Sequence, residues 1–276
     1  MLIRVGYDIA YELPAPTAMI LLLNVLPERL PDLRTPDKLR VEPEVPVTDF
    51  IDCFGNRCVR LVAPAGKFRI YNDLVVEDNG LPVPVFEDAR QHQIEEIPTE
   101  FLQYLLPSRY CEVDKLNFIA EELFGKIPPG WQRVQAICDW VHANIQFGYE
   151  FASATKSAYE VFQERKGVCR DFTHLAVTFC RVMGVPARYC TGYLGDIGVP
   201  VSPMPMDFSA CFQVYLGGRW HTFDARHNKR RIGWILMATG RDATDCAITT
   251  TFGLHTLEKF VVWSDEVNSA ELCQRV

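Results

Sequence analysis

One of the ten cysteines of this chain differs from the others by its position. Cys169 follows a turn at Gly167, and apolar residues recur after it at helical spacing as far as Met183. That spacing predicts a helix from about Cys169 to Met183. A thiol in the first turn of a helix lies near unbonded backbone N–H groups and the positive end of the helix dipole, and both favour the thiolate. Cys169 is therefore a candidate nucleophile, and a core cysteine at a helix start is the plain alternative.

A predicted hairpin brings polar groups toward this helix. Gly217 and Gly218 form a two-residue turn between two strand-like runs, 210–216 and 219–225. Counting back from the turn makes Ser209 and Asp224 diagonal neighbours on one face. A cysteine on a helix with two polar groups on a neighbouring hairpin has the layout of a catalytic triad.

Four segments together carry a resemblance to a known family. They are Gly167-Val-Cys-Arg-Asp-Phe, Gly184-Val-Pro-Ala-Arg-Tyr, Asp207-Phe-Ser-Ala-Cys-Phe-Gln-Val-Tyr and Trp220-His-Thr-Phe-Asp224. Their combined spacing resembles the core of the transglutaminase-like superfamily over roughly residues 110 to 255. The region before that core is similar to the N-terminal part of bacterial members regarded as candidate cysteine proteases.

The resemblance implies a papain-like fold and a Cys–His–Asp triad in that chain order. It also implies hydrolysis or acyl transfer at an amide bond through a thioester. Cys169 and Asp224 match the first and last members of the triad. The position of the histidine holds Ser209 in this sequence, and a serine does not act as a general base near pH 7.

Three other histidines are compared as substitutes for the missing base. His221 has the wrong parity for the Asp224 face of its strand, and His174 lies well round the helix from Cys169, so both are expected to be structural. His227 follows the strand, where alternation need not hold, and it is the best spare base. Arg226, opposite Ser209, and Asp171 are further candidates to line the cleft.

Composition excludes several classes of function. The net charge is −7, which argues against nucleic-acid binding. The longest apolar run, Ala18 to Leu23, is far too short to span a bilayer, and the first residues do not look like a signal peptide. We therefore expect a cytoplasmic protein that acts on a peptide or amide substrate, without membrane association; its oligomeric state is left open.

No cofactor or metal is expected. No cysteine pair shows CxxC spacing, and no histidine pair has zinc-finger spacing. A metal site formed by Cys169, His174 and Cys211 is a weak alternative, and no acidic loop suggests calcium. The other cysteines are expected to be mostly reduced core residues.

The hydrophobic pattern predicts an α+β fold with two domains. Residues 1–105 are expected to form a β-sandwich, with strands near 3–11, 18–26, 47–54, 58–63, 68–76 and 82–86. Residues 106–276 are expected to form a papain-like, transglutaminase-like core of helices packed on an antiparallel sheet. Its helices are expected near 113–123, 131–145, 157–167 and 169–183, and the first strand of its sheet near 187–193.

Two functions follow. The first is a cysteine hydrolase or acyltransferase in which Cys169, His227 and Asp224 act at a site that also holds Ser209. The second is a catalytically impaired scaffold that binds peptides or proteins, because the usual triad histidine is replaced by Ser209.

Overall fold

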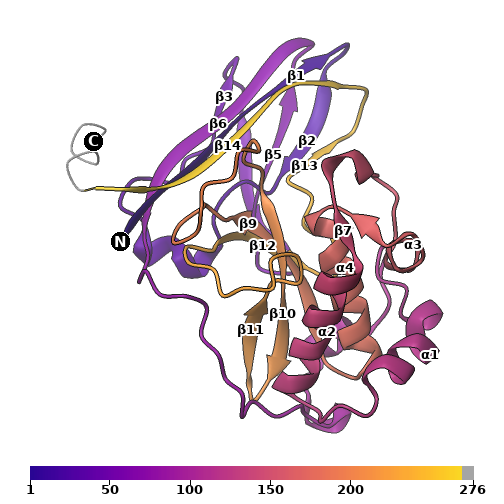
Figure 1. Cartoon of the computed structure of the whole chain (residues 1–276). Helices are drawn as coiled ribbons and strands as arrows, with labels where there is room; N and C mark the ends of the chain where they lie inside the picture. The colour runs from indigo at the N-terminus through magenta and orange to yellow at the C-terminus, as the bar shows by residue number, and fades with distance from the viewer. Residues whose placement is uncertain (269–276) are drawn as a thin grey trace.

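The computed structural model describes residues 1–268, and it has the predicted α+β architecture (Figure 1). Two four-stranded antiparallel sheets form the β-rich part, in the orders β14-β1-β6-β3 and β13-β2-β5-β4. Their strands are β1 (Leu2–Leu13), β2 (Thr17–Leu21), β3 (Arg40–Glu42), β4 (Val47–Ile51), β5 (Arg57–Ala63), β6 (Gly66–Glu77), β13 (Thr249–Thr251) and β14 (Thr256–Val267).

These two sheets form one core, as the sandwich prediction requires. Alternate residues of β1, from Ile3 to Ile9, have no exposed surface, and they pack with Leu21 of β2 and Leu61 of β5. The strand expected near 82–86 is wrong. Pro82 and Pro84 cannot donate backbone hydrogen bonds, so this segment is irregular; the Val83 N–H bonds to the Arg231 carbonyl, and the Val83 carbonyl accepts from Arg230.

A third sheet and four α-helices form most of the remainder of residues 1–268. The third sheet has the order β11-β10-β9-β12 and is antiparallel. Its elements and the helices are β9 (Ala187–Tyr193), β10 (Ser209–Leu216), β11 (Arg219–Phe223), β12 (Ile235–Gly240), α1 (Val113–Phe124), α2 (Trp131–Asn144), α3 (Ala158–Glu164) and α4 (Cys169–Val182). The remaining elements are a short parallel pair, β7 (Gln146–Phe147) and β8 (Lys166–Gly167), and the 3₁₀ helices η1 (Pro27–Asp32), η2 (Ile94–Glu96), η3 (Thr99–Leu105) and η4 (Tyr149–Phe151).

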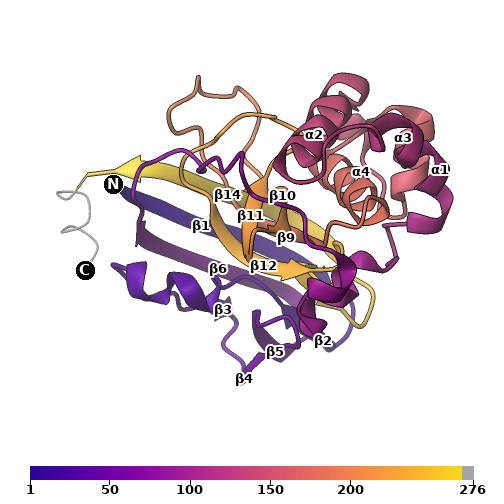
Figure 2. The ribbon, with the colours of Figure 1, turned by 90° about the horizontal axis from the view of Figure 1, so that it is seen from below.

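The third sheet lies between the helices and the β-rich part (Figure 2). Phe212, Val214 and Leu216 of β10 pack against the helices, in one core with Phe179 of α4. Tyr193 of β9 and residues of β12 belong instead to the core of the two N-terminal sheets. Strand β10, which begins at Ser209, packs on the helices and pairs with β9 and β11 on its two edges, which suits it to position a site.

The predicted hairpin is confirmed next to its turn but is shorter than expected, so the ladder does not place Arg226 opposite Ser209 or Asp224 diagonal to it. Gly217 and Gly218 both have positive φ, 55° and 83°, and Leu216 pairs with Arg219. The pairing continues to Phe212 and Phe223 and then stops. Asp224 therefore begins a turn and does not continue the ladder.

Helix α3 begins as expected but ends early. Ser157 accepts a hydrogen bond from the Glu160 N–H, and the Glu160 carboxylate accepts one from the Ser157 N–H, so the predicted capping box is present. The helix ends at Glu164 and not at Gly167. Arg165 adopts the left-handed conformation, and the next two residues pair with β7.

The two ends of the described chain lie together. Strand β14 pairs with β1 along nearly its whole length, and β13 pairs with β2. The division into domains 1–105 and 106–276 stays a prediction, although these late strands join the N-terminal sheets. Within residues 1–268, no helix combines the length and the apolar character needed to cross a membrane.

Candidate active site

The first turn of α4 is held by a side-chain cap. Asp171 has a fully buried side chain that accepts a hydrogen bond of 2.9 Å from the Val168 N–H and pairs with Arg170. Such a cap stabilises a helix by about 1 kcal/mol. Gly167 is required beside it, because a Cβ there would lie 2.6 Å from the Asp171 Cβ. Asp171 thus fixes the residue on each side of Cys169 and does not face a substrate as a reacting group.

Cys169 is half-buried at the start of this helix, whereas seven other cysteines among residues 1–268 are buried. Removal from water raises the pKa of its thiol, Arg226 and the Ala210 N–H oppose that rise, and Asp207 adds to it. The Arg170 N–H also points to the sulfur. All nine cysteines of the described residues are unpaired, as expected, while Cys273 lies outside them.

Asp224 and His227 form a close pair at the end of β11. His227 Nδ1 lies 2.7 Å from Asp224 Oδ2, and the other carboxylate oxygen accepts the backbone N–H groups of Arg226 and His227 at 3.0 Å. The Asp224 side chain is 5% exposed and the His227 side chain 25%. The Asp224 carboxylate thus holds the imidazole of His227 by Nδ1, and Nε2 is its second ring nitrogen.

The turn that carries this pair is itself fixed. Asn228 adopts a positive φ of 49°, and its side chain bonds to Gln135 and Asp139 of α2. His142 Nδ1 lies 2.7 Å from the Arg226 carbonyl oxygen. Helix α2 therefore holds the turn from 224 to 228 in one conformation.

Two neighbouring cavities meet at the site. One, of about 770 Å³, is lined by Cys169 and Ala210, and the other, of about 560 Å³, by Ser209 and His227. Tyr149, Asp207 and Phe208 line both cavities. The structure thus brings Ser209 and His227 to one cavity and Cys169 to the next, and strand β10 joins them through the consecutive residues Ser209 and Ala210.

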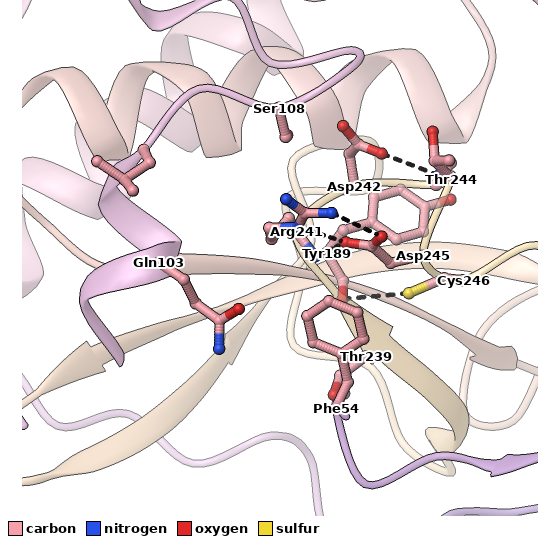
Figure 3. Close-up of polar contacts among 12 residues, drawn as sticks. Phe54, Gln103, Ser108, Tyr189, Thr239, Arg241, Asp242, Thr244, Asp245 and Cys246 are labelled. Carbon is pink, nitrogen blue, oxygen red and sulfur yellow. Dashed lines mark hydrogen bonds and ion pairs between the residues drawn. The ribbon is translucent and has the colours of Figure 1, made fainter. Parts of the chain in front are cut away.

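A loop after β12 forms one wall of the Cys169 cavity. Asp242 accepts the Thr244 N–H at 2.9 Å, Arg241 pairs with Asp245, and the Cys246 thiol faces the Tyr189 carbonyl (Figure 3). Asp242 also accepts the Tyr110 N–H at 2.9 Å. These bonds fix the conformation of the loop and connect it to Tyr110, which also lines the cavity.

His174 of α4 stabilises this wall by a hydrogen bond to its backbone. It is fully buried and stacks on Tyr110, and its Nε2 accepts the Ala243 N–H at 3.1 Å. Burial lowers its pKa to about 3, so it stays neutral. Cys211 pairs across the sheet with Cys190. Accordingly, Cys169, His174 and Cys211 do not gather as a metal site, and residues 1–268 hold no group of three or more His, Cys, Asp or Glu that could do so.

His221 is buried in the core, as expected from strand alternation, which turns it to the face opposite Asp224. It is 5% exposed and lies against the rings of Phe86 and Trp131. Its Nε2 lies 3.1 Å from the Leu216 carbonyl oxygen. Burial lowers its pKa, so a neutral, structural histidine fits this position.

Sequence reasoning missed Asp207 and the tyrosines of the cleft. Burial raises the pKa of Asp207, and its own neighbour's N–H and Arg226 oppose that rise. Its place two residues before Ser209, on the same side of an extended chain, was the available signal. Tyr110, Tyr149 and Tyr189 come from three separate elements, and no local pattern connects them.

Opposite charges near the sulfur predict opposite changes in reactivity. Arg226→Ala should raise the thiol pKa of Cys169, because a positive charge that favours the thiolate is lost. Asp207→Asn should lower it, because a negative charge is lost. We expect the pH profile of Cys169 alkylation by iodoacetamide to move to higher pH in the first variant and to lower pH in the second. Shifts in the same direction would contradict this placement of the two charges.

Comparison with known proteins shows the fold and the family of this chain. A crystal structure of a "putative cysteine protease" from Cytophaga hutchinsonii is 32% identical, with a TM-score of 0.81 over 98% of this chain and 91% of that one. The family model of the transglutaminase-like superfamily matches residues 117–225. The chain belongs to the transglutaminase-like superfamily.

Two curated proteins are also similar. An uncharacterized protein of Mycobacterium leprae is 25% identical over 72% of this chain and 73% of its own length. The kyphoscoliosis peptidase of Mus musculus is 29% identical over 40% of this chain, but the match covers only 18% of the mouse protein. The superfamily match includes Cys169, Ser209 and Asp224 and ends before His227.

Proposed function

We propose that this transglutaminase-like protein is a cysteine hydrolase or acyltransferase that cleaves an amide or peptide bond through a thioester on Cys169. The observation that carries the proposal is the 2.7 Å pair of His227 and Asp224. That pair follows the strand next to β10, whose Ala210 N–H reaches the Cys169 sulfur. In this proposal His227 is the general base, because Ser209 occupies the position where the family usually has its histidine.

In the first step, the Cys169 sulfur forms a bond to the amide carbonyl carbon. The thiol proton passes to His227 Nε2, by way of the Ser209 hydroxyl that shares its cavity, and Asp224 stabilises the resulting imidazolium. The Cys169 N–H, in the first turn of α4, binds the oxyanion in this proposal.

In the second step, the carbon–nitrogen bond breaks and the leaving amine takes the proton from His227. Water then attacks the thioester carbonyl, the carbon–sulfur bond breaks, and the sulfur regains a proton. A second amine in place of water gives acyl transfer.

The proposal is tested by alkylating the sulfur. Fluorescein-labelled casein, an unfolded polypeptide, serves as substrate, and Cys169 is modified by iodoacetamide to graded extents measured by peptide mass spectrometry. We expect peptide-bond cleavage to fall in proportion to the fraction of Cys169 modified. Full cleavage after complete modification of Cys169 would contradict the proposal.

The second candidate is a scaffold without catalysis, which Ser209 and the separate cavities of Cys169 and His227 favour. Ser209→His restores the family's usual residue and separates the two candidates. If the natural chain is an enzyme that uses His227, it cleaves casein before this change. Activity that appears only in the Ser209→His variant would identify the natural chain as a scaffold.

A further inference from the structure

Strand β13 contributes a hydrogen-bonding edge to the Cys169 cleft. Its Thr249 and Thr250 line the same cavity as Cys169. In the part of the chain that the structure describes, β13 is the last strand of its sheet and pairs only with β2. Its other edge is therefore available to a further strand.

The register identifies the groups on that edge. Leu22 N–H bonds to the Ile248 carbonyl, and Phe252 N–H bonds to the Ala18 carbonyl. In an antiparallel ladder, bonded and non-bonded positions alternate, so Thr250 also faces β2. The N–H and C=O groups of Thr249 and Thr251 consequently point away from β2.

Several residues that line the cavity shared by Cys169 and β13 have short neutral side chains: Ala152, Ser153, Ala154, Ala243, Thr244 and Ala247. They leave room for a chain beside the larger lining residues, which are Tyr110, Tyr149, Tyr189, Phe208, Arg170 and Asp207. Unpaired backbone groups in a cleft of this kind are complemented by another extended backbone.

We propose that β13 binds the main chain of an extended polypeptide substrate as an added strand, with Thr249 as the residue that pairs with it beside Cys169. This inference rests on the proposed function and specifies its substrate class: unfolded or extended polypeptide, recognised by its backbone. Strand β13 lies outside the family core matched at residues 117–225, so the recognition element belongs to the N-terminal sheets.

The test compares two reagents that react with the same sulfur. An alanine-glycine hexapeptide with a C-terminal chloromethyl ketone alkylates Cys169, whose sulfur displaces chloride and forms a thioether. Iodoacetamide alkylates Cys169 without needing the cleft walls. The second-order rates of both are measured by mass spectrometry on the full chain.

Thr249→Pro removes the outward N–H and leaves the bonds of β13 to β2. We expect it to slow the hexapeptide reagent about five- to tenfold and to leave the iodoacetamide rate unchanged. Thr249→Ala controls for the lost side chain. Asp49→Pro controls for a proline on a sheet edge. The Asp52 N–H bonds to the Asn56 carbonyl, and bonded positions alternate along the β4–β5 ladder, so the Asp49 N–H lies on the outer edge of β4. Asp49→Pro should react with the hexapeptide at the wild-type rate, and the slowing in Thr249→Pro is measured relative to Thr249→Ala.

A wild-type hexapeptide rate in Thr249→Pro would overturn the inference while leaving the proposed function intact, since casein cleavage tests that separately. If Thr249→Pro does not fold, wild-type protein is tested with hexapeptide reagents N-methylated at successive amides. Methylation should slow the reaction at every second amide, because only alternate groups of a strand face its neighbour. Equal effects at all positions, or none, would also overturn the inference.

Discussion

Replacing Cys169 with serine is expected to lower the rate of casein cleavage by about a thousandfold or more. A serine hydroxyl is far less acidic than a thiol, and a base positioned for a thiol does not compensate for that difference. The side chains are similar in size, so the urea midpoint of unfolding should change little. The measurement is kcat/KM with a fluorescent peptide substrate, alongside urea unfolding of the same protein.

Cys53→Ser is the matched control for that experiment. Cys53 is the exposed cysteine of the described chain, lies in the turn between β4 and β5, and does not line the Cys169 cavity. Its replacement should leave kcat/KM unchanged. Retention of activity in Cys169→Ser, with the fold intact, would remove Cys169 from the mechanism.

Replacing His227 with glutamine is expected to lower kcat about 10²- to 10⁴-fold, the usual contribution of a general acid–base group. Glutamine keeps a polar group near Asp224 but does not exchange a proton near neutral pH. KM should change little, because the loss falls on proton transfer rather than on substrate binding. Steady-state kinetics on a peptide substrate measure both constants.

His255→Gln is the control for this second variant. His255 is an exposed histidine in the turn before β14, and its Nδ1 contacts Thr251. It should keep wild-type kcat. Equal activity in His227→Gln and His255→Gln would show that the Asp224–His227 pair has no part in catalysis.

Local patterns in the sequence were sufficient to predict much of this site. Helix α4, the Gly217-Gly218 hairpin and its register follow from short-range spacing, and the structure has them within a residue or two. The contact of His227 with Asp224 was foreseen only as a departure from strand alternation. It arises because Asp224 accepts two backbone N–H groups and closes the chain into a turn.

Other parts depend on contacts between distant segments. The β13–β2 and β14–β1 pairings join residues more than two hundred positions apart, and no local pattern fixes such partners. The wall at 241–248 is held by a buried histidine of α4 and by an N–H from Tyr110. Asp207 lies in the site only because the fold brings the first turn of α4 and the start of β10 to the same cavity.

The chemistry proposed at Cys169 predicts a covalent acyl-enzyme that can be isolated. The protein is mixed with N-acetylglycine p-nitrophenyl ester, quenched in acid within milliseconds, and examined by intact mass and peptide mapping. We predict one N-acetylglycyl group on Cys169, which accumulates in His227→Gln because the same base is needed to activate water. Turnover of the ester with no acyl group on Cys169, or turnover that persists in Cys169→Ser, would contradict a Cys169 thioester mechanism.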